Sequence, residues 1–347
     1  MTDLPLNPCI LAIESSCDET SAAVYLPARQ QLFQEIYSQV ALHADYGGVV
    51  PELASRSHLE KLYGVVESVL SQSSLTLQDV DAVAYTRGPG LVGPLLIGAS
   101  YADALSLALD VPLLPVHHLE AHITIPMFEF SDLCFPFLAL LVSGGHTELI
   151  LAKDLGHYEL LGSTMDDAAG EAFDKCGKVM GLEYPAGPKL AQLADAFVPG
   201  EYPDLPTPLK GNPTLDFSFS GLKTAFARSW DLHYASYSSN AFAYAIQHAI
   251  VHHLTSRVKK VWSSYPEMPL VVAGGVAANQ CLRTSLSDTA KSVQRQVFFP
   301  DLCYCTDNAG MIAHNAYLHW DRFGVWGSRA QRVRPRWPIE TLLSRDE

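Results

Sequence analysis

The sequence predicts an α/β protein built from two duplicated halves, each with a sheet flanked by helices, that face one another across a cleft. A β-hairpin plan, which consists of an apolar run, a small polar turn and a second strand, occurs twice, about 130 residues apart. Two further apolar runs lead into glycine turns and then into helical patterns. A chain of 347 residues also exceeds what one core usually accommodates.

The two hairpins occupy equivalent segments of the halves. The first has an apolar run at 9–13, a polar turn at 14–20 and a strand at 22–26. The second has an apolar run at 137–142, a turn at 143–147 and a strand at 149–152. Each plan therefore presents a polar loop between two strands.

Glycine turns follow two other predicted strands, at 82–85 and at 270–273. Such turns expose backbone N–H groups at the start of a helix, where they can bind phosphate or pack against a flat ring. Neither turn matches GxGxxG or GxxxxGK[ST], so the dinucleotide-binding and P-loop classes lose support.

Residues 240–262 repeat apolar positions at helical spacing and predict a long amphipathic helix. We expect its His248, His252 and His253 at the surface or on a cleft wall, because no carboxylate or cysteine accompanies them at ligand spacing. A Pro- and Gly-rich stretch at 199–213 predicts a long loop, and 310–318 an apolar helix.

These patterns divide the chain into an N-terminal lobe at 1–125 and a C-terminal lobe at 126–310 that carries a loop insertion near 199–213. Residues 311–347 are expected to form a terminal helix and a basic tail that pack back on the N-terminal lobe.

Composition indicates a compact globular enzyme, since 48% of the residues are apolar and 17% charged. Polar and proline residues interrupt the apolar stretch at 91–115, which argues against a membrane span. The start of the chain shows no secretory signal, and seven scattered cysteines fit reduced thiols better than disulfides. We therefore expect a cytoplasmic protein with no membrane partner.

A formal net charge of −14 argues against broad, nonspecific nucleic-acid binding. One segment near the end differs, because it has no acidic residue and carries Arg322, Arg329, Arg332, Arg334 and Arg336. This basic tail has two readings, a contact with a phosphate backbone or a solvated extension.

His118 and His122 are four residues apart, so a helix would place both imidazoles on one face, where they can bind one metal ion. Glu120 does not directly follow His118, which disfavours the HExxH protease pattern. Asp307 is a candidate third ligand, although it is also suited to a helix N-terminus. Two histidines and one carboxylate suit iron or zinc acting as a Lewis acid, whereas an ordinary helix with solvated histidines is the alternative.

Seven ordered motifs resemble the universal tRNA threonylcarbamoyladenosine transferase family, and the resemblance runs from about residue 10 to residue 343. The motifs are the loop 14–20, HLEAH at 118–122, LVSGGHT at 141–147, DDAAGEAFDK at 166–175, SFSGLKT at 218–224, GGVAAN at 274–279 and TDN at 306–308. The ending RPRWP at 334–338 resembles the bacterial branch.

The resemblance implies two duplicated lobes of the actin/hexokinase/heat-shock-protein-70-like (ASKHA) fold with a cleft between them. It implies that the threonylcarbamoyl group of threonylcarbamoyl-AMP is transferred to N6 of the adenosine just 3′ of the anticodon, position 37, in tRNAs that read codons beginning with A. The product is t6A. The implied partners are tRNA, a smaller paralogous subunit of the same fold that pairs with the N-terminal lobe, and an accessory P-loop ATPase.

Site residues carried over by the resemblance form two groups. The metal ligands are His118, His122 and Asp307, for one ion that is iron (Fe²⁺) rather than zinc. The adenylate contacts are Leu141, Val142, Ser143, Gly144, Gly145, Asp174, Gly187 and Asn279. Asp174 is expected to accept hydrogen bonds from both ribose hydroxyls.

For catalysis we expect electrostatic positioning by the metal and the N–H groups of 143–145, without an acyl-enzyme. Asp18 and Glu14 are the candidates to orient the attacking amine or a metal-bound water. Cys17 is the rival nucleophile, but a packed thiol is the favoured interpretation because no histidine adjoins it in the sequence. A small-molecule kinase of the same fold and a noncatalytic scaffold of an RNA-processing complex are the alternatives, although the histidine pair is atypical of Mg²⁺-dependent kinases.

Overall fold

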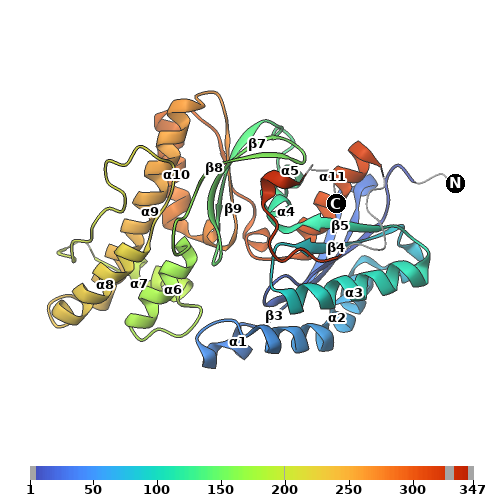
Figure 1. Ribbon diagram of the computed structural model, residues 1–347, viewed down its shortest axis with the longest axis horizontal. Coiled ribbons are helices and arrows are strands. Elements are labelled where there is room, and N and C mark those ends of the chain that lie inside the picture. Colours follow the sequence, from blue (N-terminus) through green and yellow to red (C-terminus); the bar gives the residue numbers. More distant parts are fainter. Residues whose placement is uncertain (1–4, 199, 325–331, 343–347) are drawn as a thin grey trace. The chain divides into compact units, whose positions relative to one another are not determined.

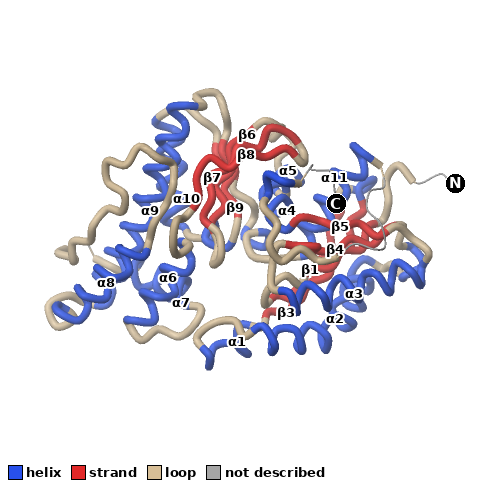
Figure 2. The backbone as a smooth tube through the Cα atoms, in the orientation of Figure 1, coloured by secondary structure: helices blue, strands red, loops and turns tan. Residues whose placement is uncertain are grey.

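The computed structural model describes residues 5–198, 200–324 and 332–342, and the chain divides into two compact units. Unit 1 comprises the described parts of 1–133, 155–157 and 306–347. Unit 2 comprises those of 134–154 and 158–305. Figure 1 shows both units with most of the elements labelled, and Figure 2 shows that each contains its own sheet.

Unit 1 contains a five-stranded sheet in the order β3-β2-β1-β4-β5. Its strands are β1 (Ile10–Glu14), β2 (Glu19–Leu26), β3 (Gln31–Ser38), β4 (Ala82–Gly88) and β5 (Leu113–His117). The first three form an antiparallel meander, whereas β4 pairs in parallel with both β1 and β5. The predicted hairpin is confirmed, with Ile13 opposite Ala22.

Helices cover both faces of this sheet. They are α1 (Val40–His43), α2 (Pro51–Ser73), α3 (Val92–Leu109), α4 (His118–Thr124), α5 (Pro126–Glu129) and α11 (Ala309–Phe323). Because side chains alternate along a strand, Leu11 and Val24 share a core with α2. Tyr25 faces the other way and packs against His314 and Tyr317 of α11.

Unit 2 repeats the arrangement with the order β10-β9-β6-β7-β8. Its strands are β6 (Phe137–Val142), β7 (Thr147–Asp154), β8 (His157–Ser163), β9 (Leu270–Ala273) and β10 (Val297–Phe298). In each unit the first strand is central, the next two extend the sheet on one side and the last two on the other. The duplication predicted from the two hairpins is therefore confirmed at the level of strand order.

Five α-helices accompany the sheet of unit 2 within its described residues. They are α6 (Ala169–Val179), α7 (Ala186–Asp195), α8 (Ser220–His233), α9 (Ser239–Ser264) and α10 (Gln280–Ser292). Helix α9 confirms the long amphipathic helix, because its apolar positions, such as Phe242, Ile246 and Leu254, are fully buried. Arg257 of α9 holds the loop before α8 by donating to the carbonyls of Leu209, Asn212 and Thr214.

The prediction for the histidines of α9 is wrong at one position. His248 and His252 are exposed, but His253 is buried between the rings of Phe217 and Phe219. Burial lowers the pKa of His253 to about 4, so it packs as a neutral imidazole.

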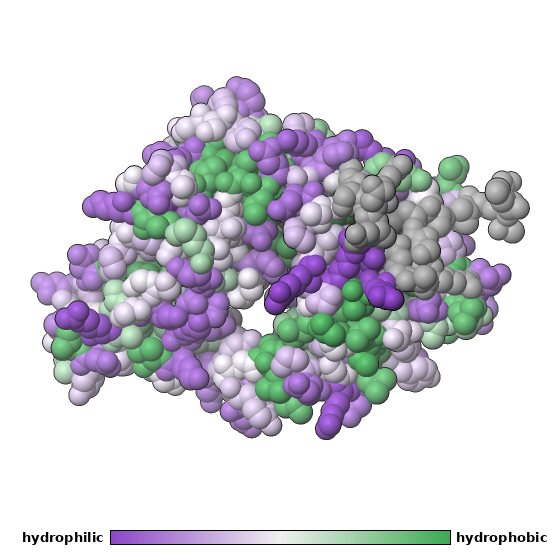
Figure 3. All heavy atoms as spheres, viewed as in Figure 1, coloured by the Kyte–Doolittle hydropathy of each residue, from purple (hydrophilic) through white to green (hydrophobic). Residues whose placement is uncertain are grey.

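Helix α3 is the one helix among the described residues that is long and apolar enough to cross a membrane by length and composition, with 28% of it buried. Pro94 does not interrupt it, because proline is tolerated in a first helical turn. Its buried face, which includes Leu95 and Ala102, packs on β4 and α2. Hydrophobic residues are exposed on its other side, as Figure 3 shows over this part of unit 1.

Candidate functional site

His118 and His122 of unit 1 lie on α4, which begins directly after β5. The ring of His117, at the N-cap, accepts a hydrogen bond from the N–H of Glu120 at 3.3 Å and so starts the helix. One turn separates His118 from His122, and their ring centroids are 4.7 Å apart. The helix predicted from the sequence is confirmed, and it presents both imidazoles on one face.

Asp307 approaches the histidines from the segment that precedes α11, and α11 packs against α4. The alternative that Asp307 serves only as a helix cap does not hold. The cap is Asn308, whose side chain accepts from the N–H of Met311 at 2.9 Å. The carboxylate of Asp307 is therefore available to the histidines.

The three side chains converge on one point. Asp307 Oδ1 lies 3.0 Å from His122 Nε2 and 3.5 Å from His118 Nε2. One nitrogen or oxygen atom from each residue lies within 4.8 Å of the others. Atoms that coordinate one metal at about 2.0–2.2 Å are themselves about 3.0–3.5 Å apart, so this His-His-Asp cluster fits a single ion.

Glu14, at the end of β1, contacts His118 on the side of the ring away from Asp307 and is itself fully buried. Its Oε2 lies 3.1 Å from His118 Nδ1 and accepts from Thr86 Oγ1 at 2.5 Å, while Oε1 accepts from the N–H of Ser16. A carboxylate on one ring nitrogen fixes the tautomer and leaves the other nitrogen for a metal. Glu14 therefore orients His118 so that Nε2 faces Asp307.

The local charge favours a cation. Burial opposes the ionisation of Glu14 and Asp307, but contacts with His118 lower the pKa of both carboxyls. Burial would lower the pKa of His118, yet Asp307 and Glu14 outweigh it and raise that pKa to about 10. Burial lowers the pKa of His122, which keeps this imidazole neutral, the form in which histidine binds metals. About a quarter of the Asp307 side chain is exposed, so the cluster is reachable from outside.

The first polar loop borders this cluster and is anchored by His58 of α2. His58 Nε2 lies 3.0 Å from the carbonyl oxygen of Cys17, and Nδ1 lies 2.8 Å from Thr20 Oγ1. Burial, followed by the charge of Asp18, raises the pKa of the Cys17 thiol far above its usual range. The same two causes raise the pKa of Glu19 to about 9. Cys17 is thus held as a thiol, the poorer nucleophile.

In unit 2, two glycine turns leave the same edge of the sheet. Strands β6 and β9 are parallel and pair Leu141 with Ala273, so the turns that follow them are neighbours. Gly274 has φ +92°, and a Cβ there would lie 2.5 Å from the carbonyl oxygen of Val142. Only glycine fits this approach of one turn to the other. The carboxyl edge of parallel strands is where open α/β sheets bind ligands.

Two of the three backbone N–H groups of the turn at 143–145 already donate hydrogen bonds within the turn, whereas all three were expected to stabilise the ligand. Ser143 N donates to the carbonyl of His146 at 2.8 Å, and Gly145 N donates to Ser143 Oγ at 3.3 Å. Within the described residues, Gly144 is the member of the trio whose N–H has no acceptor. Gly144 and Gly145 are exposed with open space around them, so a ligand has room to approach.

The other predicted contacts in unit 2 are anchored by hydrogen bonds. Asp174 Oδ1 accepts from the N–H groups of Ala186 and Gly187, at 2.8 and 3.1 Å, and so caps the start of α7. Burial outweighs these bonds and raises the pKa of Asp174. Asn279 caps α10 through Leu282 N and donates to Gln247 Oε1 at 2.8 Å. Sequence reasoning missed Gln247, as it missed Thr86 and His58, because none belongs to a motif.

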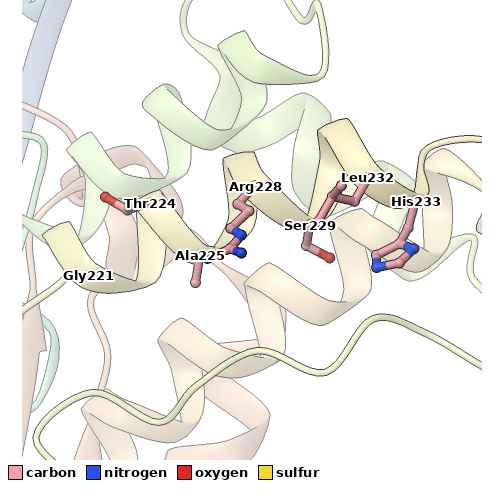
Figure 4. Close-up of a pocket in the computed structure, with 7 residues that line it drawn as sticks. All are labelled: Gly221, Thr224, Ala225, Arg228, Ser229, Leu232 and His233. Atoms are coloured by element: carbon pink, nitrogen blue, oxygen red, sulfur yellow. The ribbon is translucent and has the colours of Figure 1, made fainter.

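A groove of about 420 Å³ runs along α8 in unit 2, and Figure 4 shows the side chains that line it. Its lining residues are Gly221, Thr224, Ala225, Arg228, Ser229, Leu232 and His233. None of the predicted site residues lines this groove, and all its side chains come from one helix.

Comparison with solved structures identifies the fold. Full-length HypF in its phosphate- and nucleotide-bound form shares 14% identity at a TM-score of 0.61, over 92% of this chain and 48% of HypF. The activator of 2-hydroxyisocaproyl-CoA dehydratase from Clostridium difficile, with bound ADPNP, shares 13% identity at 0.52, over 89% and 93%. YeaZ from Pseudomonas aeruginosa is 20% identical over 44% of this chain, at a TM-score of only 0.32. The chain spans 63% of YeaZ and about half of HypF.

The likenesses to HypF and to the dehydratase activator confirm the predicted ASKHA fold. A family profile described as TsaD, tRNA N6-adenosine threonylcarbamoyltransferase, matches residues 30–314. The match spans most of the chain and includes the histidine pair, the glycine turns and Asp307. Members of this family are metal-binding transferases that form threonylcarbamoyladenosine in tRNA. The chain therefore belongs to the tRNA N6-adenosine threonylcarbamoyltransferase family.

Proposed function

We propose that this chain transfers the threonylcarbamoyl group of threonylcarbamoyl-AMP to N6 of adenosine 37, in tRNAs that read codons beginning with A. A new bond joins N6 to the carbamoyl carbon, the bond from that carbon to the phosphate oxygen breaks, and AMP leaves with the electron pair while N6 loses a proton. The His118–His122–Asp307 cluster, in a chain of this family, is the observation that carries the proposal.

We propose that the cluster holds one Fe²⁺ through His118, His122 and Asp307. The donor set fits such an ion, because two imidazoles and one carboxylate are typical of iron sites with open positions. When bound, the ion would act as a Lewis acid toward negative charge on phosphate or carbonyl oxygens. Glu14 contributes by fixing the orientation of His118.

The adenylate is proposed to bind at the glycine edge of unit 2, against Leu141, Val142, Ser143, Gly144, Gly145, Asp174, Gly187 and Asn279. The open space at Gly144 and Gly145 supports this assignment, since backbone can approach a ligand closely there. The second carboxylate oxygen of Asp174 is then the acceptor for ribose hydroxyls, because Oδ1 is engaged by α7. Solved relatives of this fold hold nucleotides according to their titles, which agrees with the proposal.

Direct transfer, without an acyl-enzyme, is the proposed course. Cys17 has its pKa raised by burial and by Asp18, so it is a poor nucleophile. Asp18 is the proposed residue that orients the attacking amine, because it is half-buried, and so partly accessible, in the loop beside the cluster. Glu14 is buried behind His118, which leaves it a positioning role.

A smaller paralogous subunit and an accessory P-loop ATPase are the proposed partners, acting with this chain on tRNA in the cytoplasm. Exposed apolar side chains on α2 and α3 of unit 1 support a docking surface for the paralogue, with Leu59 68%, Tyr63 63% and Leu96 48% exposed. A net charge of −14 also suggests that the chain needs help to capture tRNA.

A reconstituted transfer assay tests the function. The complex is given threonylcarbamoyl-AMP and an unmodified tRNA transcript, and digested nucleosides are analysed by mass spectrometry. Formation of t6A in the substrate tRNA, and not in the same transcript with guanosine at position 37, is the expected result. A parallel reaction with added ATP and candidate small molecules tests the kinase alternative, which transfer of the γ-phosphate to a small molecule without any t6A would indicate.

A further inference from the structure

The C-terminal segment 332–338 is built into unit 1 and is not a loose extension. Arg334 N donates to the carbonyl of Arg87 at 2.8 Å, and Gly90 N donates to the carbonyl of Pro335 at 3.1 Å. Gly88 permits the contact, since a Cβ there would lie 1.9 Å from the carbonyl oxygen of Arg334. The segment thus lies against the turn that follows β4.

Two guanidinium groups from distant parts of the sequence share one indole ring. The guanidinium carbons of Arg87 and Arg334 each lie 5.3 Å from the ring centroid of Trp337, which is 8% exposed. Arg87 Nε also donates to the carbonyl of Arg332 at 2.9 Å. Cation–π contacts and a carbonyl therefore hold two like charges together.

Arg332 and Arg336 extend this cluster and are exposed. Among the described residues, no carboxylate forms an ion pair with Arg87, Arg332 or Arg336. Several lysines differ, because Lys153, Lys175, Lys189, Lys223 and Lys291 each pair with an aspartate or glutamate. In an acidic chain, positive charge is thus concentrated in this segment, and Figure 3 shows strongly hydrophilic side chains beside α3, where this segment runs.

We propose that Arg87, Arg332, Arg334 and Arg336, arranged around Trp337, form a binding surface for the phosphate backbone of RNA. Guanidinium groups match phosphate oxygens in geometry and charge, and an arginine held in place loses less entropy on binding. Burial and the charge of Arg334 lower the pKa of Arg87, as expected for two neighbouring cations. This inference rests on the proposed function, in which the RNA is tRNA.

The surface is connected to the metal helix. Trp337 packs on His117 with ring centroids 4.6 Å apart, and its carbonyl oxygen lies 3.0 Å from His117 Nε2. His117 in turn caps α4, the helix that carries His118. His117 therefore contacts both Trp337 of the arginine surface and the helix that carries the candidate metal ligands. This proximity suits an RNA whose phosphates bind at the surface and whose target base lies near the metal site.

Salt-dependent binding of unmodified tRNA to the assembled complex tests the surface. Arg332→Gln/Arg336→Gln changes exposed residues, so folding and metal content should be unaffected. Each lost phosphate contact should flatten the slope of log K against log salt by about one unit and weaken binding up to roughly tenfold at 0.1 M salt. The charge-retaining Arg332→Lys/Arg336→Lys should stay near the wild-type slope, and so should Arg29→Gln/Lys291→Gln, which removes exposed charges elsewhere.

Binding is measured without transfer, so the surface and the reaction can fail separately. An unchanged slope in Arg332→Gln/Arg336→Gln, and in Arg87→Gln as a second variant, would overturn the surface even if the complex makes t6A. A changed slope in a complex that makes no t6A would leave the surface intact and reject the proposed reaction. Loss of a protein subunit from the variant complex at unchanged tRNA affinity would show that the surface binds protein and would refute the inference.

Discussion

The two units share one strand order, but the residues at the carboxyl edge of their parallel strands differ in chemical character. In unit 1 the parallel strands β1, β4 and β5 carry ionisable or polar side chains at or near their carboxyl ends, namely Glu14, Thr86 and His117 with its neighbour His118, although β4 itself also leads into a glycine turn at Gly88. In unit 2, β6 and β9 end in glycine turns whose backbone is open. The two copies of one framework thus differ, because unit 1 presents a cluster of ionisable side chains and unit 2 presents open backbone that a ligand can approach.

This difference predicts how each site fails. A site made of buried charges depends on chemical identity, because removing one partner leaves another unpaired. The glycine turns of unit 2 depend on volume at Gly274, because a methyl group added there meets the carbonyl oxygen of Val142. Substitutions that keep the shape of a side chain but remove its charge should damage the site in unit 1. Substitutions that add atoms at Gly274 should damage the site in unit 2.

His122→Ala should have the largest effect, because it removes one of three candidate ligands. Elemental analysis should find that most bound metal is lost, and the transfer rate should fall by roughly a hundredfold or more. His252→Ala, which removes an exposed histidine of α9, should retain both. Full metal content in the His122 variant would refute the assigned cluster.

Glu14→Gln keeps the shape and removes the charge behind His118. Loss of a partner of this kind typically lowers metal affinity by about 10–100-fold, and we expect that range here. Competition with a chelator measures it. The exposed Glu60→Gln is the matched control. Unchanged affinity would mean that Glu14 does not orient the ligand.

Gly274→Ala should harm unit 2 through volume and backbone strain. With φ +92° and a carbonyl oxygen 2.5 Å from the new Cβ, the free energy of unfolding should fall by about 1–3 kcal/mol. Adenylate binding, followed by calorimetry, should weaken while metal content is kept. Gly275→Ala, whose Cβ has no neighbour within 4 Å, should change stability by about 0.5 kcal/mol at most. Equal effects of the two substitutions would contradict the role of volume.

Cys17→Ser should have the smallest effect, since a thiol with a raised pKa contributes little as a nucleophile. We expect the transfer rate to stay within about threefold of wild type. Asp18→Ala should lower the rate more than it lowers adenylate affinity. A threonylcarbamoyl adduct on Cys17, detected by intact-protein mass spectrometry, would establish a covalent route instead.

Much of the fold could be predicted because its signals are local. Both hairpins, α9 and the helix of the histidine pair follow from periodicity and turn residues over short windows. Residue type made Asp307 a candidate ligand, and the resemblance assigned it to the pair. Its convergence with His118 could not be derived from local patterns, since 189 positions separate them and the packing of α11 on α4 brings them together.

The parts that could not be predicted depend on contacts between distant elements. His58 and Thr86 carry no motif, and their roles appear only where α2 and β4 meet the first loop. His253 was expected at the surface or on a cleft wall because no carboxylate or cysteine accompanies it at ligand spacing, whereas two phenylalanines from another segment bury it. Of the basic tail, Arg329 lies outside the described residues.

The central claim is that the His118–His122–Asp307 cluster of this chain supports threonylcarbamoylation of tRNA, and nucleoside mass spectrometry of tRNA from depleted cells tests it most directly. Depletion should remove t6A, and expression of the wild-type chain or of His252→Ala should restore it. His122→Ala, expressed at the same level, should not. Unchanged t6A on depletion, or full restoration by His122→Ala, would contradict the account.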